Sequence, residues 1–411
     1  MTPERRMKYW LALQLIFGQG SPYINEIVEK FGTALDFFRA GEEGWNTITD
    51  ILPLHLEQLA QPDIPAVEQI IADCEKAECK IITPEDESYP EELRHIYGMP
   101  AVLYVLGDLS CLKDHLAIAM VGTRECTSIA VSTADKIAKD LARHKVVVVS
   151  GMALGIDAAC HWGAINGGSK TVAFLSCGLD QVYPQENTAL WSRICANGAV
   201  VSEYPPGTSV TRHSFHVRNR LISGVSRGVV MVQGAQQSGT NITITHGLEQ
   251  GKEIFVVPWN IDTEEGRWAV QLLREGAIAI SDADQILEEY GYLEPSRPQD
   301  SGEEREQRHE KLHDTVARKK HSGKKASKTA GKEQTEPEPD EKPETAPAPA
   351  ELPELEGDMK LVYDLLGEEE LEPEEIAERI GVPPGELTVL LTEMEVLGIL
   401  KPASGGGYLR G

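Results

Sequence analysis

The residues best suited to binding phosphate lie close together, between Phe215 and Arg220. Arg218 and Arg220 stand on either side of Asn219, shortly after the aromatic ring of Phe215. An arginine fork binds two phosphate oxygens at once, and an aromatic ring stacks on a nucleobase. We therefore predict that Phe215, Arg218, Asn219 and Arg220 contact the phosphates and bases of a nucleic-acid strand. The alternative is an ordinary helix N-terminus whose arginines are solvated.

Two shorter motifs each follow an apolar run that is typical of a buried strand. Gly122, Thr123 and Arg124 end one run: glycine lets a ligand approach the backbone, threonine offers a hydroxyl and arginine binds phosphate. Ser150 and Gly151 end the next run and open a turn whose backbone amides suit an oxyanion. We predict that both motifs contribute to the same phosphate-binding pocket.

A third motif begins with Ser238 and Gly239 and predicts another anion-binding loop at the start of a helix. In an alternative interpretation of the turn at residue 151, Asp157 caps the helix that follows. None of these motifs has the GxGxxG spacing of a dinucleotide-binding fingerprint or the GxxxxGK[ST] spacing of a P-loop. We expect no bound cofactor, no metal and no catalytic residues.

Alternating strand and helix patterns surround these motifs between residues 80 and 292. Seven apolar runs are continuous rather than alternating, which indicates strands covered on both faces of a sheet. These runs are residues 116–122, 146–151, 171–178, 199–204, 228–234, 253–259 and 277–281. The predicted fold class is α/β, with an extended Rossmann-like, doubly wound and mainly parallel sheet. Ligands of such sheets bind beyond the carboxyl ends of the strands, where the motifs lie.

Three further segments flank the predicted core, which spans residues 80–292. Residues 1–75 contain short amphipathic patterns broken by glycine and proline, which predict a small helical-hairpin domain. Residues 293–352 are first basic and then acidic and proline-rich, which predicts a disordered linker. Residues 353–411 predict three amphipathic helices followed by a glycine-tipped hairpin, the order of a winged-helix domain.

The formal net charge of −26 argues against indiscriminate binding to duplex DNA, but the charge is unevenly distributed. Residues 351–411 hold 15 acidic and 4 basic residues, whereas residues 212–220 hold three arginines, two histidines and no acid. Seven cysteines without CxxC or zinc spacing indicate reduced thiols. No apolar run is long enough to span a bilayer, and the N-terminus lacks a signal-peptide cleavage site. We expect a cytoplasmic protein with no membrane partner.

The order of motifs resembles the DprA (Smf) family. VGTR, SGMALGIDAACH, CGLD with VYP and EN, SEYPPG, FxxRNRLISGVS, QQSGTNIT and FVVP follow one another as is typical of that family. The resemblance covers roughly Tyr89 to Pro258, and the helical N-terminal and winged-helix C-terminal segments resemble common additions to the family. His216, Gln233 and Trp259 depart from its usual Pro, Glu and Gly, as does Gly266-Arg267-Trp268 from Gly-x-Asn.

The resemblance implies sequence-independent binding and protection of single-stranded DNA. It also implies homodimerisation and delivery of the DNA to the RecA recombinase in natural transformation and homologous recombination. Carried over position by position, the pocket consists of Gly122, Thr123, Arg124, Ser150, Gly151, Phe215, Arg218, Asn219 and Arg220, with Ser238 and Gly239 at its rim. Arg124, Arg218 and Arg220 are expected to meet at one rim, each neutralising one phosphate.

Two other function classes remain as alternatives. A nucleotide phosphoribohydrolase on a related Rossmann-like fold would need a Glu/Arg pair beside a PGGxGT-type loop. The sequence has QQSGTNIT there and Gln233 in place of an acid, which leaves Glu203 as the strand-end carboxylate to test. A protein-interaction scaffold with a vestigial pocket is disfavoured by the clustered arginines.

Overall fold

The computed structural model describes residues 3–113 and 115–293, and individual residues between 360 and 410. The chain divides into two compact units, Met1–Thr329 and Ala330–Gly411. The predicted linker 293–352 lies almost entirely outside the described residues, as do most of the three predicted C-terminal helices. In the second unit, β10 (Leu400–Pro402) and β11 (Tyr408–Arg410) pair as an antiparallel hairpin, as predicted.

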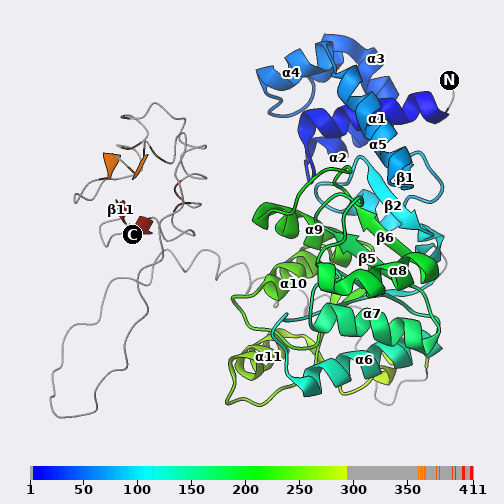
Figure 1. The fold of residues 1–411 in the computed structure, drawn as a ribbon, viewed down its shortest axis with the longest axis vertical. Coiled ribbons are helices and arrows are strands. Elements are labelled where there is room, and N and C mark those ends of the chain that lie inside the picture. The colour runs from blue at the N-terminus through cyan, green and yellow to red at the C-terminus, as the bar shows by residue number, and fades with distance from the viewer. Residues whose placement is uncertain are drawn as a thin grey trace. The chain divides into compact units, whose positions relative to one another are not determined.

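A nine-stranded mixed sheet forms the centre of the first unit (Figure 1), in the order β1-β2-β6-β5-β4-β3-β7-β8-β9. Neighbouring strands from β6 to β9 pair in parallel. The parallel strands are β3 (Ala117–Val121), β4 (Val147–Ser150), β5 (Thr171–Leu175), β6 (Ala199–Ser202), β7 (Gly228–Met231), β8 (Glu253–Val256) and β9 (Ile278–Ala279). Each lies inside one of the seven predicted runs, so the doubly wound parallel sheet is confirmed.

Two antiparallel strands at one edge were not predicted. β2 (Leu103–Gly107) pairs with β6, and β1 (Lys80–Ile82) pairs with β2. They were missed for two reasons. They lie outside the alternating strand–helix pattern, and the periodicity of a short apolar run does not distinguish a strand from a helix.

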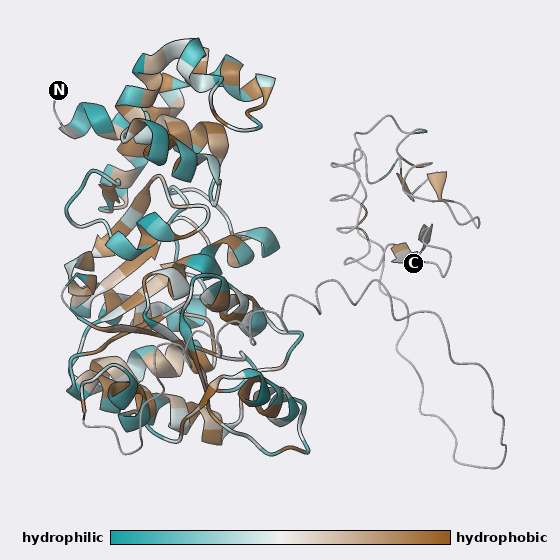
Figure 2. Ribbon diagram, turned by 180° about the vertical axis from the view of Figure 1, so that it is seen from behind, coloured by the Kyte–Doolittle hydropathy of each residue, from teal (hydrophilic) through white to brown (hydrophobic). Residues whose placement is uncertain are grey.

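Helices cover both faces of the sheet, and the alternation of side chains along each strand divides the core in two. Ile118 and Met120 of β3 pack in a cluster with α6 (Ser128–Arg143), whereas Ala119 and Val121 pack with α9 (Arg212–Gly224) and α10 (Gly239–Glu249). Figure 2 shows the strands coloured mostly as hydrophobic between helices that carry both colours. The remaining helices of this region are α7 (Ile156–Gly167), α8 (Thr188–Asn197), α11 (Glu264–Glu275) and α12 (Asp284–Glu289).

Five helices precede the sheet: α1 (Pro3–Phe17), α2 (Tyr23–Phe31), α3 (Ala34–Trp45), α4 (Pro53–Ala60) and α5 (Ile64–Lys76). The buried Gln14 of α1 joins them to the sheet, because its amide nitrogen donates to the carbonyl oxygens of Val102 and Glu203. The Tyr104 hydroxyl donates to its amide oxygen at 2.7 Å. The N-terminal helices therefore share a buried polar contact with the core.

Within the part of the chain that the structure describes, none of the helices is long and apolar enough to cross a membrane. All seven cysteines are free thiols, and five of them are buried, in keeping with the prediction of reduced thiols.

Strand order determines where a ligand pocket can form. The chain runs outward from β3 through β4 and β5 to β6 and then returns to place β7 on the other side of β3. The carboxyl ends of β3 and β7 therefore flank the topological switch point, where open α/β sheets bind ligands.

The buried His161 of α7 makes folding sensitive to pH. The Thr171 hydroxyl donates to the carbonyl oxygen of Val148, so its oxygen accepts the proton of His161 Nδ1 at 2.7 Å. Burial, aided by the positive charge of Arg218, lowers the pKa of His161 to about 3. The folded protein therefore holds this imidazole neutral, while the unfolded chain protonates it near pH 6.5.

We expect the stabilisation from neutral His161 to be complete above pH 6.5 and to be lost progressively as the pH falls towards 3. Between pH 7.5 and 5, the free energy of unfolding of the wild type should fall by about 2 kcal/mol more than that of His161→Leu. Urea unfolding at both pH values measures this difference. The control His144→Leu, at an exposed position, retains the buried imidazole and its pH dependence. If the free energy of unfolding changed with pH by the same amount in the wild type and in His161→Leu, the prediction would be contradicted.

Candidate nucleic-acid interface

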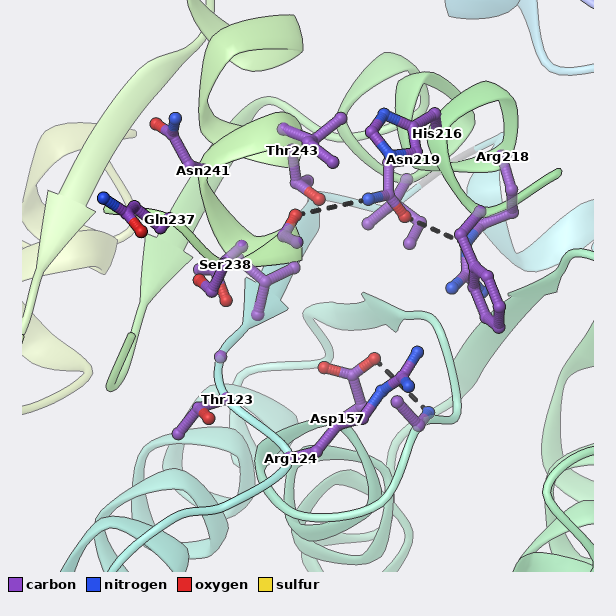
Figure 3. Close-up of a pocket in the computed structure, with 18 of the residues that line it drawn as sticks. Thr123, Arg124, Asp157, His216, Arg218, Asn219, Gln237, Ser238, Asn241 and Thr243 are labelled. Carbon is purple, nitrogen blue, oxygen red and sulfur yellow. Dashed lines mark hydrogen bonds between the residues drawn. The ribbon is translucent and has the colours of Figure 1, made fainter. Parts of the chain in front are cut away.

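A cavity of about 720 Å³ opens at the switch point between β3 and β7. Its walls come from the segment after β3, the start of α9, and the loop that leads into α10 (Figure 3). Eight of the eleven predicted site residues line it: Gly122, Thr123, Arg124, Phe215, Arg218, Asn219, Ser238 and Gly239. Ser150, Gly151 and Arg220 are not among its lining residues.

The segment after β3 brings a cation to the pocket mouth. Gly122 packs so tightly that an added Cβ would lie 2.5 Å from Ile156 and 2.7 Å from the carbonyl oxygen of Gln233. The backbone amide of Thr123 donates to that same carbonyl oxygen at 2.8 Å. These contacts fix the backbone and leave the Arg124 side chain exposed, where its guanidinium is accessible to a ligand.

The first turn of α9 presents an aromatic ring between charged groups. A capping box fixes this turn, because Thr211 Oγ1 accepts from the amide of Ser214 and Ser214 Oγ accepts from the amide of Thr211. The guanidinium carbons of Arg124 and Arg218 lie 5.0 and 5.7 Å from the centre of the Phe215 ring. The ring is therefore held by two cations and remains half-buried at the pocket wall.

Arg218 is a buried cation that joins the ends of two strands to the pocket. Its Nη1 donates to the carbonyl oxygens of Gly151 and Phe174, and its Nε donates to the side chain of Asn219 at 3.0 Å. Burial lowers the pKa of Arg218 to about 10, against the opposing effect of nearby Asp157. The guanidinium thus stays charged at neutral pH and provides a fixed positive wall.

The turn after β4 does not supply free amides to the pocket, contrary to the prediction. The carboxylate of Asp157 accepts from the amides of Gly151 and Ala153 at 3.1 and 3.4 Å. Ser150 is fully buried, and its hydroxyl donates to the carbonyl oxygen of Met120. Asp157, proposed from the sequence only as an alternative cap, occupies the oxyanion position itself, and burial raises its pKa.

The prediction that Arg220 shares a rim with Arg124 and Arg218 is wrong. Arg220 lies on a different face of α9 from Arg218 and does not line the pocket, and its Nη2 donates to both carboxylate oxygens of Glu203 at 2.7 and 2.5 Å. Both side chains are almost completely buried. The amide of Gly20, from the N-terminal helical region, donates to the same carboxylate at 3.2 Å. Arg220 therefore stabilises the fold and does not contribute to the pocket surface.

The N-terminus of α10 forms the opposite wall. Ser238 is its cap residue, but the Ser238 hydroxyl donates to the carbonyl oxygen of Ala235 rather than capping the helix. Asn219 Nδ2 donates to the carbonyl oxygen of Gly239 at 3.4 Å, which ties α9 to the start of α10. The helix thus opens towards the pocket with Ser238 and Gly239 at its edge, a position that favours an anion.

Sequence reasoning missed several polar residues that line the same pocket. Arg212 and His216 lie one helical turn apart at the start of α9, and Gln237 and Asn241 lie on the opposite wall. Partial burial, together with the charge of His213 and Arg212, lowers the pKa of His216. The basic composition of residues 212–220 was the available signal for Arg212. Nothing in the spacing of QQSGTN indicates which of its side chains turn inward.

The described fold and pocket define a doubly wound α/β protein with a cationic, aromatic-walled pocket at its switch point. A family model for DNA recombination-mediator protein A matches residues 80–291, and one for the DprA winged helix domain matches residues 346–406. The chain belongs to the DprA/Smf family. The second match supports the predicted winged-helix domain.

Relatives agree with this assignment. The DNA processing protein DprA of Bacillus subtilis is 35% identical over 225 residues, covering 55% of this chain and 76% of its own. Protein Smf of Synechocystis is 30% identical over 289 residues, covering 69% and 73% respectively. The X-ray structure of DNA processing protein A from Streptococcus pneumoniae superposes with a TM-score of 0.56 at 27% identity, over 68% of this chain and 97% of that one.

Replacing Arg220 should destabilise the fold, because Arg220→Ala leaves the buried carboxylate of Glu203 without its cation. We expect the free energy of unfolding to fall by about 3–5 kcal/mol, measured by urea denaturation. The double variant Arg220→Met with Glu203→Gln removes both charges and should recover much of the loss. Arg124→Ala, at an exposed position, serves as the matched arginine control and should unfold like the wild type. A fully stable Arg220→Ala protein would contradict this role.

Proposed function

We propose that this protein binds single-stranded DNA, without sequence preference and without catalysis, in the pocket between β3 and α10. The arrangement of Arg124, Phe215 and Arg218 carries this proposal. It places an aromatic face beside one accessible and one fixed cation, the combination that accommodates a stacked base and its phosphate. Gly122, Thr123, Asn219, Ser238 and Gly239 complete the proposed site.

The position of the aromatic ring favours a single strand over a duplex. Phe215 stands in the wall of a recessed cavity, so a base must leave its stack to lie against the ring. A flexible strand can present unstacked bases at little cost, whereas opening a paired duplex costs a few kcal/mol per base. Backbone phosphate contacts and stacking tolerate any base, which supports binding without sequence preference.

The buried carboxylates of Glu203 and Asp157 have other partners, which supports a binding role over catalysis. Glu203, the strand-end acid singled out for a phosphoribohydrolase, is paired with Arg220 away from the pocket. Gln233 holds the amide of Thr127 at the start of α6. Asp157 lines the pocket, but its carboxylate accepts from two backbone amides. Incubation with nucleoside monophosphates should therefore release no free base; release of base would favour the enzyme.

Membership of a recombination-mediator family supports the wider proposal. We propose that the protein acts in the cytoplasm as a homodimer and delivers bound DNA to the RecA recombinase in transformation and recombination. We further propose three domains, residues 1–75, 80–292 and 353–411, with residues 293–352 as a linker between the last two. No cofactor or metal enters this proposal.

The full-length protein should prefer single strands. Fluorescent oligo-dT of roughly ten or more nucleotides should bind more tightly than a blunt duplex of the same length at physiological salt, because only the single strand can place a base against Phe215. Anisotropy titrations at two salt concentrations measure the preference. Equal affinity for the two ligands at physiological salt would overturn the proposed function.

Arg124→Ala should weaken binding of oligo-dT by about 1–3 kcal/mol, since the exposed guanidinium is proposed to contact a phosphate. The slope of log K against log[salt] should flatten by about 0.7, the single-strand value for one phosphate. Arg124→Lys should restore the slope but only part of the affinity, because lysine lacks the bidentate fork.

Phe215→Ala is the matched comparison for Arg124→Ala. It should weaken binding at every salt concentration without changing the slope, because loss of stacking releases no counterions. Thermal melting checks that both variants are folded. A folded Arg124→Ala protein with wild-type affinity and slope would show that this residue does not contact phosphate.

A further inference from the structure

A second hollow of about 1100 Å³ lies beside the pocket and shares none of its lining residues. It is lined by Leu154, from the turn after β4, and by residues of the 181–188 loop between β5 and α8. Two apolar side chains face solvent there: Tyr183 is 39% exposed and Leu154 is 40% exposed. Two exposed apolar side chains that line one hollow offer contact surface that the fold itself does not use.

The two loops are held in place by buried polar contacts. Asn187 is buried, and its Nδ2 donates to the carbonyl oxygens of Met152 and Ala153 at 2.9 and 3.4 Å. Gln181 Nε2 donates to the carbonyl oxygen of Thr208 at 2.7 Å. The backbone on either side of the hollow is therefore fixed, so Tyr183 and Leu154 are presented by a rigid frame.

The hollow is continuous with the cationic pocket. Ala153 lines the pocket and its neighbour Leu154 lines the hollow, so one turn forms the wall between them. Across that wall, the ring centroids of Tyr183 and Phe215 are 6.0 Å apart, with an interplanar angle of 55°. Arg124, Phe215 and Tyr183 thus form a row in which each side chain contacts the next.

The chemistry of the hollow differs from that of the pocket. None of its eight lining residues carries a positive charge, and Glu186 is negative, so the hollow repels phosphate. Its lining instead combines an aromatic ring, an aliphatic side chain and the amide groups of Gln181 and Gln185. This set suits the flat face and polar edge of a nucleobase.

We propose that the hollow is a second base-binding subsite, in which Tyr183 stacks on a base of the same strand whose phosphate is held at Arg124. The strand would run from the cationic pocket over Phe215 to Tyr183, with its phosphates outside the hollow. This inference rests on the proposed binding of single-stranded DNA and extends it to a residue outside the cationic pocket.

Titration of oligo-dT against full-length Tyr183→Ala tests the inference. We expect the affinity to fall about fivefold or more, the lower end for loss of one base–aromatic stack, with an unchanged salt slope. Tyr183→Phe keeps the ring and should bind within twofold of the wild type. Tyr97→Ala is the matched control, because Tyr97 is 77% exposed and lines neither cavity; it should bind like the wild type.

Crosslinking gives a second readout that does not depend on the stability of a variant. Oligo-dT with single 5-iodouracil substitutions, irradiated with the wild-type protein, should give a peptide crosslink at Tyr183 for at least one position of the label. Leu154→Ala, which truncates the aliphatic side chain lining the hollow, should also weaken binding.

The outcomes separate the two proposals. If the wild type binds oligo-dT and Arg124→Ala weakens it, but folded Tyr183→Ala binds within twofold and no crosslink forms at Tyr183, the second subsite is wrong and the proposed function stands. A salt slope that changes in Tyr183→Ala would mean a phosphate contact and would also overturn the subsite. If the wild type does not bind single strands, the proposed function itself fails.

Discussion

The architecture of the pocket depends on the hydrogen bonds that the buried guanidinium of Arg218 donates. Among the described residues no carboxylate lies within hydrogen-bond distance of this guanidinium; instead it donates to the carbonyl oxygens at the ends of β4 and β5 and to Asn219. Asn219 in turn holds the start of α10. One cation therefore joins two strands and two helices, and the same cation lies beside the Phe215 ring.

The surroundings of Arg218 explain how an acidic protein presents a cationic pocket. The charge of Asp157 lies nearby and favours the guanidinium electrostatically, while the carboxylate is itself held by backbone amides. The excess of acidic residues in the chain as a whole is concentrated elsewhere, notably in residues 351–411. Local fields of this kind are short in range at physiological ionic strength, about 8 Å, so a small basic site can act within a negative molecule.

Continuous apolar runs predicted the seven parallel strands, because a strand that is buried on both faces needs apolar side chains at nearly every position. The position of the pocket followed as well, since Gly122–Arg124 comes directly after β3 and Ser238–Gly239 opens the helix that follows β7. The contacts of individual side chains could not be predicted from the sequence. Arg218 and Arg220 are two residues apart on a helix and so point in different directions, and only the partner Glu203, distant in sequence, determines that Arg220 is internal. The hydrogen bonds that Asp157 accepts from the turn at residue 151 likewise depend on the folded conformation of that turn.

The contacts of Gln14 and Gly20 have a consequence for how this chain can be divided. The segment matched by the family model begins at residue 80, yet Glu203 and Tyr104 within it are hydrogen-bonded to residues before that point. A fragment beginning at residue 80 would expose the Glu203–Arg220 pair to water and leave the Tyr104 hydroxyl without its acceptor. The first helices thus cover buried polar groups of the sheet domain, and a minimal folding unit of this protein includes these helices.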